Sequence, residues 1–232
     1  MNEVELELPA EALSAVPIFP LPGTVLLPGT FLSLHVFEPR YRAMMEYVIE
    51  GHRLMVVAQL DPLAPADAHG RPGIHPVAGL GLLRRSVRLP DGRYNIVLEG
   101  LGRVDVRHEL PPTLVFRRAA AELLEDVPPA DPGALDAALA SLKALCQQVL
   151  IQAGDPDPDV IQELNEIEDA GRLTDLATAA GLSDPQVRQQ VLAEAAVDAR
   201  LELVAGALGA QLLSHMDEDE GFPGWGIGTG KA

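Results

Sequence analysis

Apolar residues in the first half of the chain occur in short runs separated by proline and glycine, whereas in the second half they recur every three to four positions. Short apolar runs between turn residues are typical of strands, and the second spacing is typical of amphipathic helices. The first half predicts one helix over 38–49 and strands over 16–19, 25–27, 31–36, 54–58, 77–88, 93–99, 103–108 and 113–123. The second half predicts helices over 132–151, 158–168, 173–180, 185–196 and 198–213.

This change of pattern predicts an α+β protein with two lobes. We expect a β-rich lobe over residues 1–127 and an α-helical bundle over residues 128–213. Pro128, Pro129 and Pro132 mark the boundary, because proline holds the preceding residue in extended geometry. Residues 214–232 are acidic and then rich in glycine, which predicts a flexible tail.

The net charge, the cysteine count and the lack of long apolar runs argue against several functional classes for this chain. The chain has 232 residues and a net charge of -17, with 13 acidic and 12 basic side chains in residues 1–118 but 21 and 5 in residues 119–232. This balance disfavours non-specific nucleic-acid binding, which depends on basic side chains. The one cysteine, Cys146, excludes an internal disulfide and a cysteine zinc site. Without a long apolar run or a basic leader, we expect a cytoplasmic protein that makes no membrane contact.

Three segments carry a resemblance to a known family. Residues 17–45 read PIFPLPGTVLLPGTFLSLHVFEPRYRAMM, residues 79–103 read GLGLLRRSVRLPDGRYNIVLEGLGR, and residues 173–201 form a leucine- and alanine-rich helical stretch that ends in Arg200-Leu201. In this order they resemble the N-terminal, substrate-binding domain of Lon proteases. The resemblance implies a PUA-like β pseudobarrel followed by a helical bundle. It also implies a stand-alone form of the domain, since no ATPase or protease segment follows the bundle.

The resemblance implies a non-catalytic protein that recognises unfolded or apolar polypeptide segments, or that acts as an adaptor for a protein partner. We expect a groove where barrel and bundle meet, walled by the loop 61–75 and by Phe31, Leu34, Phe37, Arg40, Tyr41, Met44 and Met45. The tail aromatics Phe222 and Trp225 would either occupy this groove or face a partner. No catalytic residue, cofactor or metal ligand is predicted, and the oligomeric state is left open.

The FEPRY block, residues 37–41, allows a structural and a functional interpretation. As a structural element, Glu38 would accept hydrogen bonds from the first free N–H groups of the helix. Phe37 and Tyr41, four positions apart, would then pack against each other. As a functional element, Arg40 and Tyr41 would border the polypeptide groove.

A second functional class is an RNA-binding protein that uses an arginine patch. Eight arginines fall on adjacent predicted strands, namely Arg84, Arg85, Arg88, Arg93, Arg103, Arg107, Arg117 and Arg118. They would either bind an acidic partner or RNA, or lie on solvated strand faces paired with the acidic bundle. Only Tyr94 and Phe116 lie among them, which is little aromatic surface for stacking on bases.

Other candidate sites lack an essential residue. Asp155, Asp157, Asp159 and Glu166 have the spacing of a calcium loop, but Val160 occupies the position that requires glycine. The sequence GWGIGTGKA at 224–232 lacks both the first glycine of a phosphate loop and the helix that must follow it. Cys146 lies on an apolar helical face, which predicts an inert buried thiol.

Overall fold

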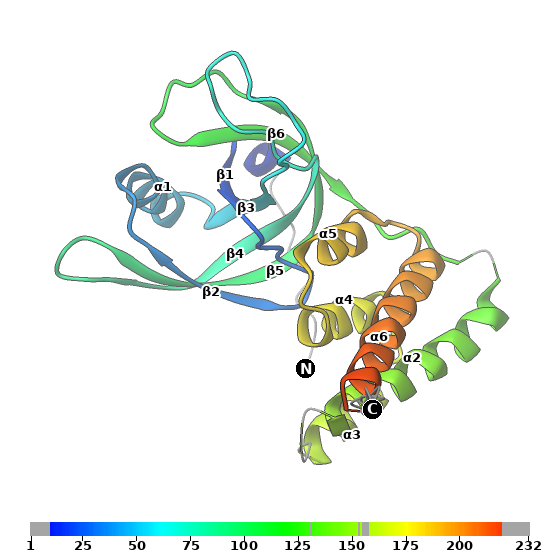
Figure 1. Cartoon of the computed structure of the whole chain (residues 1–232). Coiled ribbons are helices and arrows are strands. Elements are labelled where there is room, and N and C mark those ends of the chain that lie inside the picture. Colours follow the sequence, from blue (N-terminus) through cyan, green and yellow to red (C-terminus); the bar gives the residue numbers. More distant parts are fainter. Residues whose placement is uncertain (1–9, 130, 153, 155–157, 220–232) are drawn as a thin grey trace, which may run out of the picture.

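The computed structural model describes residues 10–129, 131–152, 154 and 158–219. It confirms the α+β class: a six-stranded mixed sheet lies on one side of the molecule and helices α2–α6 on the other (Figure 1). The strands are β1 Val16–Leu21, β2 Phe31–Val36, β3 Leu54–Gln59, β4 Val77–Arg88, β5 Tyr94–Glu109 and β6 Arg117–Leu124. A short 3₁₀ helix, η1 Ala10–Leu13, precedes them.

Five of the strands close into a barrel. The sheet order is β2-β5-β4-β3-β1-β6, and β5 also pairs with β6, so β5, β4, β3, β1 and β6 form a ring. β1 runs parallel to β3, and the other pairs are antiparallel. Small and branched side chains from all five strands fill the interior, including Ile18, Val56, Leu80, Val104 and Ala119. β2 lies outside the ring, beside the first half of β5.

β5 replaces the two strands predicted over 93–99 and 103–108. Gly100 and Gly102 do not end the strand; the register of β5 with β4 shifts near this point, between Leu80 and Gly81. The irregularity is a β-bulge, which bends a strand and increases its twist. Bending is what allows a single strand to pair with β2 and β4 near its start and with β6 near its end.

The strand predicted over residues 25–27 is wrong. The segment is irregular, although Leu26 and Leu27 are both 1% exposed. It lies across the sheet, so close to Gly79 that a Cβ atom there would come 2.1 Å from the Leu26 carbonyl oxygen. Leu26 packs in the core beneath α1, and Leu27 packs in the core of the helices. The apolar run therefore joins two cores without pairing as a strand.

Helix α1, Pro39–Glu50, covers the outer face of the barrel. Pro39 is at the first helical position, where its missing N–H costs no hydrogen bond. Successive strand residues alternate between two cores: Val56 faces the barrel interior, whereas Met55 and Val57 pack in the cluster that holds Met44 and Met45 of α1.

The second half of the chain forms the five helices that the periodicity predicts. They are α2 Pro132–Gln152, α3 Pro158–Glu166, α4 Ala170–Gly181, α5 Pro185–Ala193 and α6 Val197–Asp219. Asp169 and Asp184 cap α4 and α5 by accepting hydrogen bonds from the N–H groups of Arg172 and Gln186. Helix α6 continues to Asp219, beyond the predicted start of the tail at residue 214.

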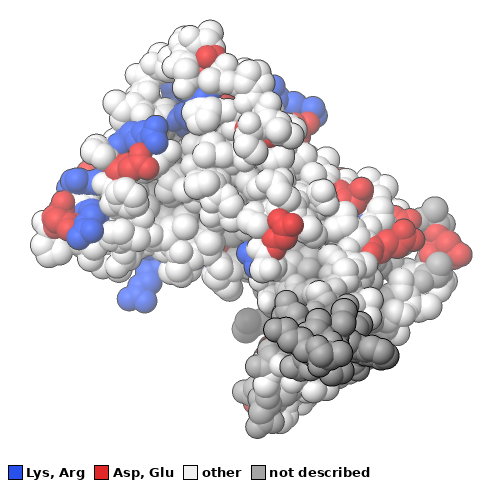
Figure 2. All heavy atoms as spheres, viewed as in Figure 1, with Lys and Arg blue, Asp and Glu red and all other residues white. Residues whose placement is uncertain are grey.

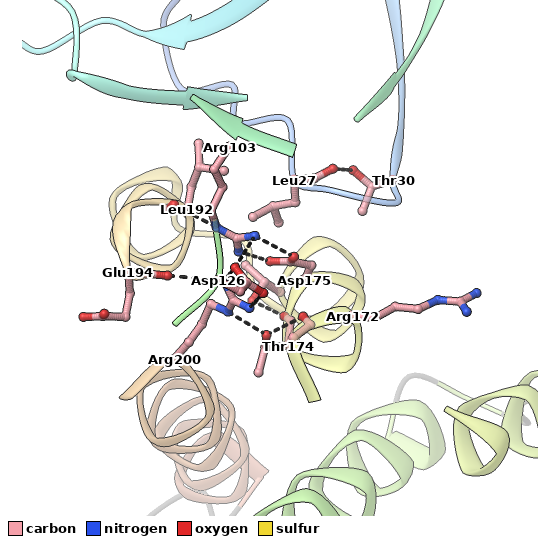
Figure 3. A network of polar contacts seen from close by, with 12 residues as sticks. Leu27, Thr30, Arg103, Asp126, Arg172, Thr174, Asp175, Leu192, Glu194 and Arg200 are labelled. Carbon is pink, nitrogen blue, oxygen red and sulfur yellow. Dashed lines mark hydrogen bonds and ion pairs between the residues drawn. The ribbon is translucent and has the colours of Figure 1, made fainter. Parts of the chain in front are cut away.

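A buried ion network joins the barrel to the helices (Figure 3). Arg103 on β5 binds both carboxylate oxygens of Asp175 on α4, and its Nε donates to the Leu192 carbonyl at 3.1 Å. Arg200 on α6 binds Asp126 through Nη1 at 2.8 Å, and Asp126 also lies 3.6 Å from Arg103. The Arg103, Asp175 and Arg200 side chains are at most 3% exposed. The network therefore fixes the helices against β5.

Candidate functional site

A cavity of about 420 Å³ is lined by two of the predicted site residues, Arg40 and Tyr41, and the segments around it lie away from helices α2–α6 (Figure 1). We call it the cap cavity. Four segments build it: the end of β1, the start of α1, the β3–β4 loop and the β5–β6 loop. Its lining residues are Pro20, Leu21, Pro22, Glu38, Arg40, Tyr41, Leu60, His69, Gly70, Arg71, Pro72, Pro112, Leu114, Val115, Phe116 and Arg117.

The β3–β4 loop is held over this end of the barrel by charged side chains. Asp67 accepts hydrogen bonds from the backbone N–H groups of His69 and Arg71, and from the Arg71 side chain at 2.6 Å. The backbone bond from Arg71 is the main reason that the pKa of Asp67 falls to about 2. Glu109 then links Arg71, at 3.2 Å, to Arg117, and Arg117 donates to the Pro72 carbonyl. This network of hydrogen bonds and ion pairs shapes one wall of the cap cavity.

The start of α1 forms the opposite wall. The Glu38 carboxylate does not cap the helix as predicted: it accepts from Arg40 Nε at 2.9 Å, while the Glu38 carbonyl accepts from the N–H groups of Tyr41 and Arg42. The Arg40 guanidinium also lies over the Tyr41 ring, 4.6 Å from its centroid. Burial raises the pKa of Tyr41, so its hydroxyl remains a neutral hydrogen-bonding group at the cavity wall.

The predicted contact between Phe37 and Tyr41 is not formed. Tyr41 packs on Phe19 with ring centroids 4.5 Å apart, whereas Phe37 is 60% exposed and stacks beside His35 at 6.3 Å. Phe37 belongs to the turn that leads out of β2, so it faces away from the core that Tyr41 enters. Phe37 is therefore an exposed aromatic group that directly precedes Glu38, a residue of the cavity lining.

The structure divides the seven predicted site residues into three groups. Arg40 and Tyr41 line the cap cavity, and Phe31, Leu34 and Phe37 lie on β2 or directly after it. Met44 and Met45 are 0% exposed in the core beneath α1, which corrects their placement on a groove wall. Met44 and Met45 can both be buried because they share with Tyr41 and Val48 the face of α1 that packs on the core.

The cap cavity does not lie where barrel and bundle meet, which is where the sequence predicted a groove. Every residue that lines the cap cavity precedes residue 118, so none comes from helices α2–α6. Leu114 and Val115, which are 39% and 68% exposed at the cavity, were predicted as strand residues. The signal available in the sequence was Pro111-Pro112, which excludes regular pairing just before them.

The arginine patch is largely neutralised by carboxylates of the same lobe. Five of the arginines form ion pairs: Arg84 with Glu99, Arg88 with Glu46, Arg93 with Asp91, Arg107 with both Asp105 and Glu122, and Arg117 with Glu109. Among the described residues, Arg103 is the one of the eight arginines that pairs with a residue of helices α2–α6. Figure 2 shows basic and acidic side chains interspersed over the barrel, and mainly acidic ones over the helices. The predicted pairing with the acidic bundle is therefore wrong for most of these arginines.

A second, smaller cavity of about 200 Å³ lies among α2, α3, α4 and α6. Its lining is apolar except for Glu163, and it includes Cys146, Val149, Leu164, Ile167 and Leu208. Cys146 is 8% exposed, and burial raises the pKa of its thiol to about 11. A thiol in this environment is a poor nucleophile near neutral pH.

We expect Cys146 to react with a thiol reagent such as DTNB about 100-fold more slowly at pH 8 in the folded protein than in urea. The reason is that only the thiolate reacts, and its population at pH 8 falls by about that factor when the pKa rises from 9.0 to about 11. The absorbance of released thionitrobenzoate measures both rates. Rates within fivefold of each other would show that the thiol is accessible and ionisable.

Some predictions fall partly outside the described residues. Asp155 and Asp157 of the calcium-like loop, and Phe222, Trp225 and the glycine-rich stretch, are among the residues that the structure does not describe. Among those that it does describe, no three His, Cys, Asp or Glu side chains are grouped as metal ligands. No described helix is both long and apolar enough to cross a bilayer.

Comparison with known proteins identifies relatives over most of the chain. The family model described as the ATP-dependent protease La (LON) substrate-binding domain matches residues 15–209. The N-terminal domain of the Mycobacterium avium complex Lon protease superposes with a TM-score of 0.66 and 18% identity, covering 84% of this chain and 98% of that one. A Lon N-terminal domain protein from Xanthomonas campestris gives 0.55 and 21%, covering 87% and 98%.

Curated relatives are longer proteins. The Lon protease of Desulfovibrio desulfuricans is 28% identical over 178 residues, which are 76% of this chain and 20% of that protein. The Lon protease of Azospirillum brasilense is 30% identical over 205 residues, which are 85% of this chain and 24% of that protein. The chain thus spans about a fifth to a quarter of the length of these relatives.

Proposed function

Because this chain belongs to the Lon substrate-binding domain family, we propose that it is a non-catalytic module that binds unfolded or apolar segments of polypeptide. Membership confirms the resemblance seen in the FEPRY block and carries a substrate-binding role. The choice of unfolded or apolar segments, in preference to a folded adaptor partner, is our proposal. The observation that supports it is the cap cavity, with its exposed Leu114 and Val115.

The chemistry of the cap cavity suits a peptide. Pro20, Pro22, Pro72 and Pro112 give rigid apolar surfaces without N–H donors, and they line the cavity together with Tyr41. Arg40 and Glu38 place one basic and one acidic group at the rim, where each can bind a peptide main chain or terminus. A concave apolar surface with a few polar groups is the usual form of a binding site.

The proposal places the contact surface on Arg40 and Tyr41 of the cap cavity and on Phe31, Leu34 and Phe37, which lie on β2 or directly after it. Phe31 and Phe37 are 67% and 60% exposed. Large aromatic side chains are the commonest anchors of protein interfaces. Their exposure on this lobe is therefore better explained by a partner than by packing.

We expect Val115→Ser to weaken the binding of an unfolded polypeptide about tenfold, because an exposed apolar anchor contributes roughly 1–2 kcal/mol at an interface. The measurement is fluorescence anisotropy of labelled, reduced and carboxymethylated α-lactalbumin at 0.15 M salt. Val127→Ser is the matched control: Val127 is 53% exposed but does not line the cap cavity. Equal losses in both variants would contradict a site at the cavity.

The same titration separates polypeptide from RNA binding. Apolar contacts survive higher salt, whereas RNA affinity falls with a log–log slope of about -0.7 per contacted phosphate. The proposal fails if the unfolded polypeptide does not bind the wild-type protein at all.

A further inference from the structure

β2 is an open edge of the sheet. Within the described residues it pairs with β5 and with no other strand, whereas each strand of the ring has at least two neighbours. The pairing is regular over six residues, from Phe31 opposite Glu99 to Val36 opposite Tyr94, without a bulge. An edge strand presents a row of unpaired N–H and C=O groups that can template another strand.

The backbone groups that face outward can be assigned from the ladder. Gly100 N–H donates to the Thr30 carbonyl at 2.8 Å, and hydrogen-bonded pairs in an antiparallel ladder alternate. Leu32, Leu34 and Val36 therefore bond to β5. The N–H and C=O groups of the residues between them, Phe31, Ser33 and His35, point away from the sheet, and all three of these residues are exposed.

Within the part of the chain that the structure describes, this edge lacks the features that prevent pairing. Natural edges carry proline, inward charges, bulges or a covering segment. Phe31–Val36 contains no proline, lysine, arginine or carboxylate, and its register is unbroken. The other strands need no such protection, because the ring closes on itself.

We propose that an extended segment of another polypeptide adds to β2 as a further strand. This inference rests on the proposed function and names the form in which the polypeptide is bound. Main-chain hydrogen bonds to Phe31, Ser33 and His35 would supply affinity that does not depend on the sequence of the segment. Such strand addition is an established mode of peptide recognition.

The side chains beside the edge indicate the pattern of the added strand. One face of the strand would cover Leu32 and Leu34, which are half-buried at the margin of the core beneath α1. The other face would meet His35, whose Nε2 lies 3.3 Å from Arg93 Nη1. Arg93 is already paired with Asp91, so this face offers hydrogen-bonding groups and no free charge. The segment would therefore alternate apolar side chains with polar ones.

A second copy of this chain is the competing occupant. Two β2 edges could pair across a two-fold axis, but each copy carries a net charge of -17, which opposes association. Sedimentation velocity tests this directly. A wild-type dimer that Ser33→Pro converts to a monomer would show that a second copy covers the edge, and would overturn the proposal.

The decisive variant is Ser33→Pro, with Ser33→Ala as its control. Proline removes the outward N–H of residue 33 and places its ring where an added strand would lie, but it breaks no bond to β5. We expect Ser33→Pro to weaken the binding of the carboxymethylated polypeptide at least tenfold and Ser33→Ala less than twofold. Circular dichroism and thermal unfolding verify that both variants are folded.

Two results distinguish failure of this inference from failure of the proposed function. If Ser33→Pro binds like wild type while Val115→Ser binds weakly, the polypeptide occupies the cap cavity and strand addition is wrong. If neither variant nor wild type binds, the proposed function itself fails. A folding defect in Ser33→Pro would not end the test, because the wild-type protein supports a second measurement.

That measurement uses a labelled peptide, Thr-Val-Glu-Val-Thr-Val-Thr, and its permutation Val-Val-Val-Glu-Thr-Thr-Thr. We expect the alternating peptide to bind the wild-type protein at least fivefold more tightly. Amide exchange followed by NMR should slow at Phe31, Ser33 and His35 and stay unchanged at Leu32 and Leu34, which are already bonded to β5. Equal affinities, or protection without this alternation, would overturn the proposal.

Discussion

Asp175→Asn is expected to lower the free energy of unfolding by about 3–5 kcal/mol, although the substitution hardly changes the shape of the side chain. Arg103 would keep its charge in a site that is 3% exposed, where it has lost its bidentate partner. Removing one member of a buried ion pair is far more costly than the pair is worth, because the remaining charge stays buried. Urea unfolding followed by circular dichroism measures the loss.

Two comparisons test the physical reason. Asp105→Asn removes a carboxylate from Arg107, which is 51% exposed, so a cost of at most about 1 kcal/mol is expected. The double variant Arg103→Met with Asp175→Leu removes both buried charges and should recover most of the lost stability. If Asp175→Asn costs no more than Asp105→Asn, the Arg103–Asp175 pair does not hold the helices to the barrel.

Asp126, the partner of Arg200, makes the stability of the folded protein depend on pH. Burial acts to raise the pKa of Asp126, but the hydrogen bond and charge of Arg200 outweigh it and hold this pKa below its usual value. A carboxyl with a lowered pKa in the folded state stabilises the protein above its unfolded pKa, and this contribution is lost as pH falls through the folded pKa. The Asp126–Arg200 contact therefore weakens only in acid.

Local sequence patterns predicted most of the helices and strands, because the residues that start, end and orient each element lie within or beside it. Proline at the first turn, an aspartate cap and a regular apolar spacing specify α5 without reference to the rest of the chain. The long strand β5 was divided in two because a glycine can either end a strand or form a bulge. Which of these occurs depends on β4, whose register with β5 shifts at the same place.

The candidate site was harder to predict because it depends on tertiary placement. Arg40 and Tyr41 of the FEPRY block line a cavity, but the predicted set of site residues did not separate the exposed Phe37 from the buried Met44 and Met45. Phe37 precedes the helix, whereas Met44 and Met45 lie on the face of α1 that packs on the core. Likewise, Arg103 and Arg107 lie on one strand with the same chemistry, and only the arrival of α4 buries one of them.

The segment at Leu26 and Leu27, which was wrongly predicted as a strand, requires glycine at the two positions that it crosses. It crosses Gly79 and Gly100 so closely that a Cβ atom at either glycine would lie 2.1 Å from a backbone carbonyl oxygen. Neither backbone oxygen can move without displacing a fully buried leucine. Because Leu26 belongs to the core beneath α1 and Leu27 to the helical core, displacement would loosen both.

Gly79→Ala is therefore expected to destabilise the protein by about 3 kcal/mol, at the upper end of the range for an overpacked core. Gly206→Ala is the matched control, since a Cβ there meets nothing within 4 Å. Gly206 is exposed within α6, where alanine should stabilise by about 1 kcal/mol. The same chemical change thus has opposite signs at the two positions, and urea unfolding measures both. A Gly79→Ala variant as stable as wild type would show that the Leu26–Leu27 segment moves freely, and that close packing there does not join the two cores.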